Sequence, residues 1–193
     1  ISTVEKNLIE GALIVIFVLV LFLGNLRAGL IVASAIPLSM LFALGLMNVF
    51  GVSANLMSLG AIDFGLIVDG AVIIVEATLH HLGLRKSMNK LTQQEMDDEV
   101  FLSASKIRNS AAFGEIIILI VYIPILTLVG VEGKMFTPMA KTVGFAIFGA
   151  LILSLTYIPM MCALFLSKNI SHKQTISDKM MNFLQSIYQP LLQ

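Results

Sequence analysis

Five long apolar stretches, separated by short polar segments, dominate this chain of 193 residues. Each is long enough to cross the hydrocarbon core of a bilayer, about 30 Å thick, as an α-helix. We place them at about 8–24, 29–49, 55–80, 106–130 and 139–167. The composition agrees, because 58% of the residues are hydrophobic and soluble domains contain only about 45 to 50%. The predicted fold class is an all-α membrane protein, a five-helix transmembrane bundle over residues 1–167.

Two of the polar segments have the pattern of short amphipathic surface helices. Thr92 and Glu95 have the spacing of a capping box, which predicts a linker helix at about 92–104. Residues 168–193 predict a second amphipathic helix that lies along the cytoplasmic membrane surface and leads to a membrane helix outside this sequence. For both segments, a solvated linker with a purely connecting role is the alternative.

Basic residues are divided unequally between the two ends of the predicted helices. Of the twelve Lys and Arg residues, three (Lys6, Lys134 and Lys141) fall on one side and the rest on the other. Because cytoplasmic segments carry the excess of Lys and Arg, the N-terminus of the chain is predicted outside and its C-terminus in the cytoplasm. Twelve acids balance the twelve basic residues, so nucleic acid is not an expected partner.

The third apolar stretch contains three carboxylates, Asp63, Asp69 and Glu76. Near the bilayer centre each ionised acid costs about 2.5 to 3.5 kcal/mol, whereas each Leu, Ile, Val or Phe favours insertion by only about 0.3 to 0.6 kcal/mol. The three acids must therefore be protonated for part of the time, be paired, or face a polar helix interface. Each of these states involves a proton or a cation, so all three are candidate proton-relay residues.

Helical geometry separates the three acids. Asp69 and Glu76 are seven residues apart and fall within about 20° of each other, whereas Asp63 lies about 120° from Asp69. Within the stretch 55–80 Asp69 lies deepest, which makes it the first candidate for the proton carrier. The alternative is a set of interhelical hydrogen bonds that only hold a bundle together. Small residues on the same helix predict close helix packing; they are Gly60, Gly65, Gly70 and Ala71.

Three other side chains are weaker candidates. Glu115 lies about ten residues into the fourth stretch and is a secondary relay candidate, with a polar contact to a neighbouring Ser or Thr as its alternative. Met40 and Met47 share a helical face and form a weak candidate pair of soft-metal ligands, because Met residues in apolar helices usually serve packing. No other metal site and no resident cofactor is predicted.

The segment DFGLIVDGAVIIVE, residues 63–76, closely resembles the signature of the heavy-metal-efflux branch of the resistance-nodulation-division superfamily. The cobalt, zinc and cadmium exporters are the nearest type. The flanking segments 7–39 and 130–140 also resemble this family, which covers nearly the whole chain. Ala77 departs from the asparagine expected after the glutamate, which leaves that end of the relay less defined.

This resemblance implies a secondary active transporter, not an enzyme: a proton-driven antiporter that exports a heavy-metal cation. It also implies a homotrimer in the bacterial inner membrane, joined to a periplasmic adaptor and an outer-membrane channel. By this analogy the chain is about a fifth of such a pump and supplies the second to sixth of twelve membrane helices. Asp63, Asp69 and Glu76 take the proton-relay positions, and the remainder of the pump polypeptide, the metal, protons and lipid are the expected partners.

Alternatives from other classes lead to different expectations. A multidrug pump of the same superfamily would carry two adjacent aspartates, whereas here Val68 precedes Asp69. Another proton-coupled exporter of this kind is also an alternative. An intramembrane aspartyl protease would place its two aspartates on different helices. In a non-transporting structural bundle, the acids would only connect helices, and Asp69→Asn would leave metal resistance unchanged.

Overall fold

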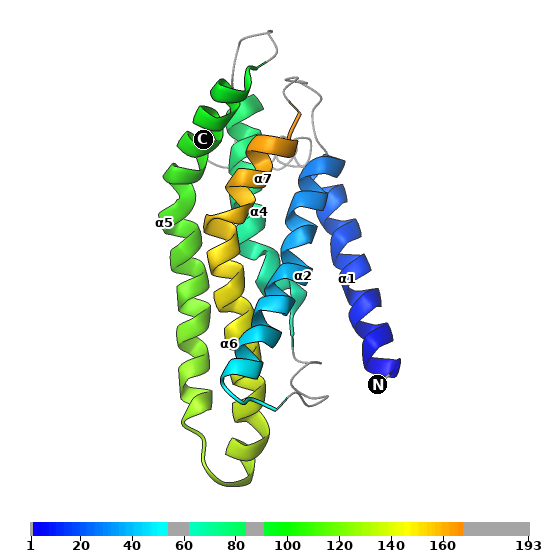
Figure 1. Ribbon diagram of the computed structural model, residues 1–193, viewed down its shortest axis with the longest axis vertical. Helices are drawn as coiled ribbons and strands as arrows, with labels where there is room; N and C mark the ends of the chain where they lie inside the picture. Colours follow the sequence, from blue (N-terminus) through cyan, green and yellow to red (C-terminus); the bar gives the residue numbers. More distant parts are fainter. Residues whose placement is uncertain (1, 54–61, 84–90, 168–193) are drawn as a thin grey trace, which may run out of the picture.

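The computed structural model describes residues 2–53, 62–83 and 91–167. Within these ranges the chain forms six α-helices and no strand. The helices are α1 (Ser2–Leu23), α2 (Leu26–Val49), α4 (Phe64–Gly83), α5 (Gln93–Leu126), α6 (Gly130–Leu155) and α7 (Tyr157–Phe165). Successive long helices run in opposite directions, and α7 continues α6 at one end of the bundle (Figure 1). The predicted all-α class is confirmed.

Four of these helices, α2, α4, α5 and α6, are long and apolar enough to cross a membrane. In addition, α1 contains a shorter apolar stretch from Ile9 to Leu23. Inside hydrocarbon, backbone N–H and C=O groups have no water to bond, and a helix satisfies them within itself. An apolar chain that crosses a bilayer repeatedly is therefore expected to take this form.

A two-residue turn joins α1 to α2. Gly24 has a φ of 60°, a left-handed conformation that glycine adopts readily because it has no Cβ, and its N–H donates to Val20 O at 3.1 Å. Asn25 then caps α2, because its Oδ1 accepts from the N–H groups of Arg27 at 3.0 Å and Ala28 at 3.4 Å. Glycine thus ends one helix and asparagine begins the next, which sets up the antiparallel pair.

The helix α5 combines two elements that the sequence predicted separately. The predicted linker helix 92–104 and the predicted span 106–130 form one helix of 34 residues. The capping box at its start is confirmed, because Thr92 N donates to Glu95 Oε2 at 2.9 Å and Glu95 N donates to Thr92 Oγ1 at 3.3 Å. Residues 93–113 contain no Gly or Pro, and extending a helix costs less free energy than nucleating another. The structure therefore replaces the two predicted helices with one.

The last predicted span, 139–167, is both extended and divided. It begins earlier, with α6 at Gly130, and it breaks at Thr156 before α7. Pro159 accounts for the break, because it has no N–H to donate to residue 155 and its ring would clash with that carbonyl in a continuous helix.

The third predicted span, 55–80, also has different bounds. The helix α4 begins at Phe64 and ends at Gly83, so its start lies well after the predicted one. Residues 54–61 lie outside the described part of the chain, as does the amphipathic helix predicted within 168–193. The predicted core of the span, from Phe64 onward, is helical as expected.

The helices pack closely where their side chains are small, and α2 packs against α1, α4 and α6. The buried small residues of α2 and α6 include Ala28, Gly29, Ala33, Ala35, Ser39, Ala43, Ala140, Ala146, Gly149 and Ala150. A Cβ added at Gly29 would lie 2.9 Å from Val20 Cα, and one at Gly149 would lie 2.6 Å from the Phe42 ring. Because lipid is as apolar as a leucine side chain, such close van der Waals contact, rather than a hydrophobic driving force, favours helix association in a membrane.

We expect Gly29→Ala to lower the free energy of unfolding by about 1 to 3 kcal/mol, because the new Cβ overpacks against a backbone atom that cannot rotate away. Gly45→Ala is the matched control, since a Cβ there meets nothing within 4 Å. Thermal unfolding of the detergent-solubilised protein should show a lower midpoint for Gly29→Ala and an unchanged or higher one for Gly45→Ala. Equal midpoints for Gly29→Ala and wild type would contradict the close contact between α1 and α2.

Candidate functional site

The helix α4 presents an exposed stripe and a buried face. Asp69, Glu76 and His80 are exposed and lie along one side of the helix, seven and four residues apart. Among the described residues, neither Asp69 nor Glu76 has a hydrogen-bond or ion-pair partner. The predicted shared face of these two acids is therefore found in the structure, and it is directed away from the other described helices.

The bounds of α4 show where the two acids lie along the helix. Within this helix of 20 residues, Asp69 is the sixth and Glu76 the thirteenth, so Glu76 lies nearer to the helix midpoint. The ranking that placed Asp69 deepest assumed a span of 55–80, and it stays a prediction. Both carboxylates lie in the interior of α4, and their ranking must rest on their surroundings.

Asp63 lies just before α4 rather than within it. Its Oδ1 accepts a hydrogen bond from Gly65 N at 2.8 Å, which is the arrangement of an N-cap side chain. Its carboxylate is exposed at the beginning of the helix. The predicted offset of about 120° from Asp69 assumed that Asp63 is helical, and it therefore does not describe this position.

Glu115 is the carboxyl group that is buried in the bundle. Its side chain is 2% exposed and extends from α5 toward α4 and α6. Ser154 Oγ lies 3.4 Å from Glu115 Oε2 and donates to it. Glu115 Oε1 is buried and has no hydrogen-bond partner among the described atoms. The contact with a neighbouring serine matches the alternative that the sequence left open for Glu115.

Gly70 makes room for this carboxyl group. A Cβ added at Gly70 would overlap Glu115 Oε1, and it would lie 3.2 Å from Ser154 Oγ. Asp69 immediately precedes Gly70 and is exposed, about 100° around α4 from it. Asp69 thus directs a carboxylate outward, while the next residue, Gly70, leaves space for the Glu115 carboxyl group inside the bundle. We call this space the Gly70 cradle.

The small residues that were predicted to allow close packing on α4 differ in burial. Gly70 and Ala71 are buried, whereas Gly65 is exposed. Gly60 lies outside the described part of the chain. Burial on α4 is therefore confirmed for Gly70 and Ala71.

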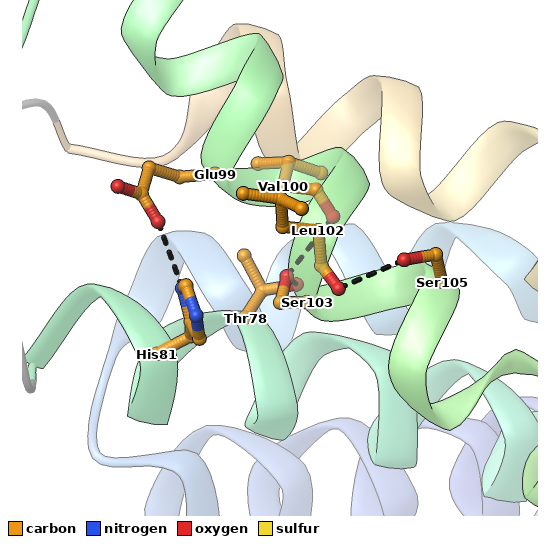
Figure 2. A network of polar contacts seen from close by, with 7 residues as sticks. All are labelled: Thr78, His81, Glu99, Val100, Leu102, Ser103 and Ser105. Atoms are coloured by element: carbon orange, nitrogen blue, oxygen red, sulfur yellow. Dashed lines mark hydrogen bonds and ion pairs between the residues drawn. The ribbon is translucent and has the colours of Figure 1, made fainter.

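A polar network joins the last turns of α4 to the first turns of α5 (Figure 2). The hydroxyls of Thr78 and Ser103 are buried and 3.1 Å apart. Each is also within hydrogen-bond distance of a carbonyl in its own helix, so one hydroxyl can bond across the interface while the other bonds its own backbone. One turn further, His81 Nδ1 lies 2.8 Å from Glu99 Oε2, which is an ion pair when the imidazole is protonated.

The α4–α5 interface therefore contains polar contacts at two levels. The Thr78–Ser103 network lies toward one end, and the Glu115 carboxyl lies about two turns of α4 deeper at Gly70. The level between them is apolar, with Ile74 and Val75 buried. Sequence reasoning missed this network, because helical periodicity does not show which partner a single hydroxyl meets on another helix.

The candidate methionine ligands lie on α2. Met47 is buried and Met40 is half-buried against the hydrophobic core. Among the described residues, no three His, Cys, Asp or Glu side chains lie close enough to share a metal ion. Metal ligation by Met40 and Met47 stays a prediction.

Long antiparallel apolar helices with carboxyl groups in their interior define a multi-pass α-helical membrane protein. Residues 1–193 match the AcrB/AcrD/AcrF family. The chain belongs to this family.

Relatives in this family are similar over the whole chain. The cobalt-zinc-cadmium resistance protein CzcA of Cupriavidus metallidurans is 50% identical over 195 residues, which cover 100% of this chain and 18% of that protein. The nickel-cobalt-cadmium resistance protein NccA of Alcaligenes xylosoxydans xylosoxydans is 46% identical, with the same coverage of both chains. The chain thus spans about a fifth of the length of these relatives.

A solved structure agrees with the sequence relatives. The crystal structure of a heavy metal efflux pump matches with a TM-score of 0.71 and 44% identity, covering 82% of this chain and 15% of that one. The predicted resemblance to the heavy-metal-efflux branch of the resistance-nodulation-division superfamily is confirmed by these relatives.

We expect Gly70→Ala to lower the free energy of unfolding by about 1 to 3 kcal/mol, because its Cβ displaces the Glu115 carboxyl group. Gly114→Ala is the matched control on α5, since a Cβ there meets nothing within 4 Å. The double variant Gly70→Ala/Glu115→Ala removes the displaced atoms, so its loss should be smaller than the sum of the single losses. Thermal unfolding of wild type, both single variants, the double variant and Gly114→Ala checks these expectations, and strict additivity would contradict the contact.

Proposed function

We propose that this chain is part of the membrane domain of a proton-driven antiporter that exports heavy-metal cations. In this proposal Asp69, Glu76 and Asp63 relay protons. The observation that carries it is the position of Asp69 and Glu76 on the exposed stripe of α4, inside a helix apolar enough to span a membrane. The names of the similar proteins, which include resistance to cobalt, zinc and cadmium, support the cargo class.

The chemistry of the stripe follows from the cost of charge in hydrocarbon. A carboxyl group there is stable when it is neutral or when a cation or polar group faces it. Uptake or release of a proton therefore changes which neighbours the α4 stripe tolerates. A pump of this kind uses that change to favour one arrangement of its helices over another, which couples proton entry to metal export.

The outward direction of the stripe indicates what must cover it. Ionised Asp69 and Glu76 would be costly against lipid, and the other described helices leave them exposed. We infer that the remainder of the pump polypeptide faces this stripe and supplies a polar or cationic partner. A homotrimer in the bacterial inner membrane, with a periplasmic adaptor and an outer-membrane channel, is proposed from the family resemblance, with the N-terminus of this chain outside and its C-terminus in the cytoplasm.

We expect Asp69→Asn in the intact pump to abolish resistance to cobalt, zinc and cadmium salts, because asparagine keeps the shape but cannot exchange a proton. Glu76→Gln should also reduce resistance, since both carboxylates lie in the interior of the same helix. Cell growth across metal concentrations is the measurement, with membrane abundance of each variant as a check. Asp97→Asn, which removes an exposed acid in the second turn of α5, is the control. Wild-type resistance of Asp69→Asn would refute the relay.

Two substitutions at Asp63 can distinguish a role in proton relay from a role as the N-cap of α4. Asparagine retains an N-cap oxygen, whereas alanine removes it at a cost of about 0.5 to 2 kcal/mol. If Asp63 relays protons, Asp63→Asn should lose metal resistance at unchanged thermal stability. If resistance survives in Asp63→Asn and falls only in Asp63→Ala together with stability, then Asp63 acts only as a helix cap.

A further inference from the structure

We propose that Glu115 is an internal proton-binding site: its carboxyl group holds a proton while docked against Gly70 and Ser154, and releases it only when α4 separates from α5. This inference rests on the proposed function, because it assumes that α4 takes part in a proton relay. It goes further by assigning a proton to a second helix, α5, which packs against a different face of α4 from the one that carries Asp69.

The surroundings of Glu115 favour a neutral acid over a carboxylate. The side chain is 2% exposed, and Ser154 Oγ, at 3.4 Å, is the one side-chain donor that reaches it among the described residues, with the Gly70 backbone beside it. That hydroxyl is shared, because it also lies 3.0 Å from Leu151 O. An ionised carboxylate buried in the bundle, with one long and shared side-chain hydrogen bond and no facing cation, is disfavoured.

Protonation of Glu115 allows Ser154 Oγ to satisfy its contacts with both Glu115 Oε2 and Leu151 O. A carboxylic acid donates its own proton to Ser154 Oγ, and the serine hydroxyl is then free to donate to Leu151 O. The remaining oxygen, Glu115 Oε1, becomes a neutral carbonyl oxygen, which costs much less to leave unpaired than a charged one. The unpartnered state of Oε1 in this structure is thus consistent with the neutral acid.

No described cation compensates a charge at this position. The helices α4, α6 and α7 pack against α5. Their charged or titratable groups are Asp69, Glu76, His80, His81, Glu132, Lys134, Lys141, Tyr157 and Cys162. On α6 the basic residue nearest to Ser154 is Lys141, which lies about 20 Å away along the helix axis. Tyr157 OH lies 3.2 Å from Ser34 Oγ on α2, and Arg108, two turns away on α5, is exposed.

Asp69 connects this site to the exposed stripe. It adjoins Gly70, whose missing side chain forms the cradle for the Glu115 carboxyl. A shift of α4 away from α5 would separate Gly70 from the Glu115 carboxyl group and let water reach it. Water is then the acceptor for the proton that Glu115 releases.

The direct test is infrared spectroscopy of the intact protein in lipid, titrated with pH. A protonated carboxylic acid gives a carbonyl stretch that a carboxylate lacks. We expect such a band at neutral pH in wild type, its loss in Glu115→Gln, and a shift in Ser154→Ala, because the hydrogen bond to the serine is removed. Glu132→Gln, which alters an exposed acid in the first turn of α6, should leave the band unchanged. If Glu115→Gln retains the full wild-type band, the proposal is overturned.

Metal-driven proton release from reconstituted vesicles tests whether the proton moves. We expect Glu115→Gln, at wild-type thermal stability, to lower metal-coupled proton flux at least tenfold and to flatten its pH dependence. Wild-type flux and pH dependence in Glu115→Gln would reduce Glu115 to a static packing group and overturn its part in the relay. Failure of the proposed function is distinguishable, because it would show as normal flux in Asp69→Asn, whereas the Glu115 band can be measured in that variant independently.

Discussion

The exclusion of water from the interior of the bundle governs the rest of the structure. Backbone groups satisfy one another within long helices, and the turns between helices are closed by local caps such as Asn25. Buried hydroxyls follow the same rule, since one of Thr78 and Ser103 can donate to the other while the second donates to a carbonyl of its own helix. A carboxyl group is the most demanding case, because it requires a partner, a proton, or an outward position. The three options together explain why the acids of this chain occupy such different places.

Two faces of α4 place carboxyl groups in different surroundings. Its outward face carries Asp69 and Glu76, which the other described helices leave exposed. Its inward face is bare at Gly70, where a carboxyl from α5 fits against the backbone. A larger residue at position 70 would separate the two helices and give water access to Glu115. Glycine therefore serves here as the surface of α4 against which the Glu115 carboxyl group packs.

The class of fold could be predicted from the sequence because it follows from the length and apolarity of the stretches alone. The common face of Asp69 and Glu76 also followed from helical periodicity, and the start of α5 from the capping box at Thr92. Helix bounds were less predictable, since the fusion within α5 depends on the cost of nucleation and the break before α7 depends on Pro159. The partner of Glu115 could not be predicted, because Ser154 is 39 residues away and only tertiary packing brings the two together.

The continuity of α5 has a mechanical consequence. Glu115 and Gln93 belong to one uninterrupted helix and lie 22 residues apart, which is about 33 Å. Gln93 Nε2 donates to the carbonyl of Ala163 on α7 at 3.1 Å. Such a helix acts as a rigid lever, so a tilt of about 5° at Glu115 would displace its first turn by roughly 3 Å. That displacement is large enough to break the hydrogen bond between Gln93 and Ala163. A tilt of α5 at the buried Glu115 carboxyl would thereby change the contact between α5 and α7.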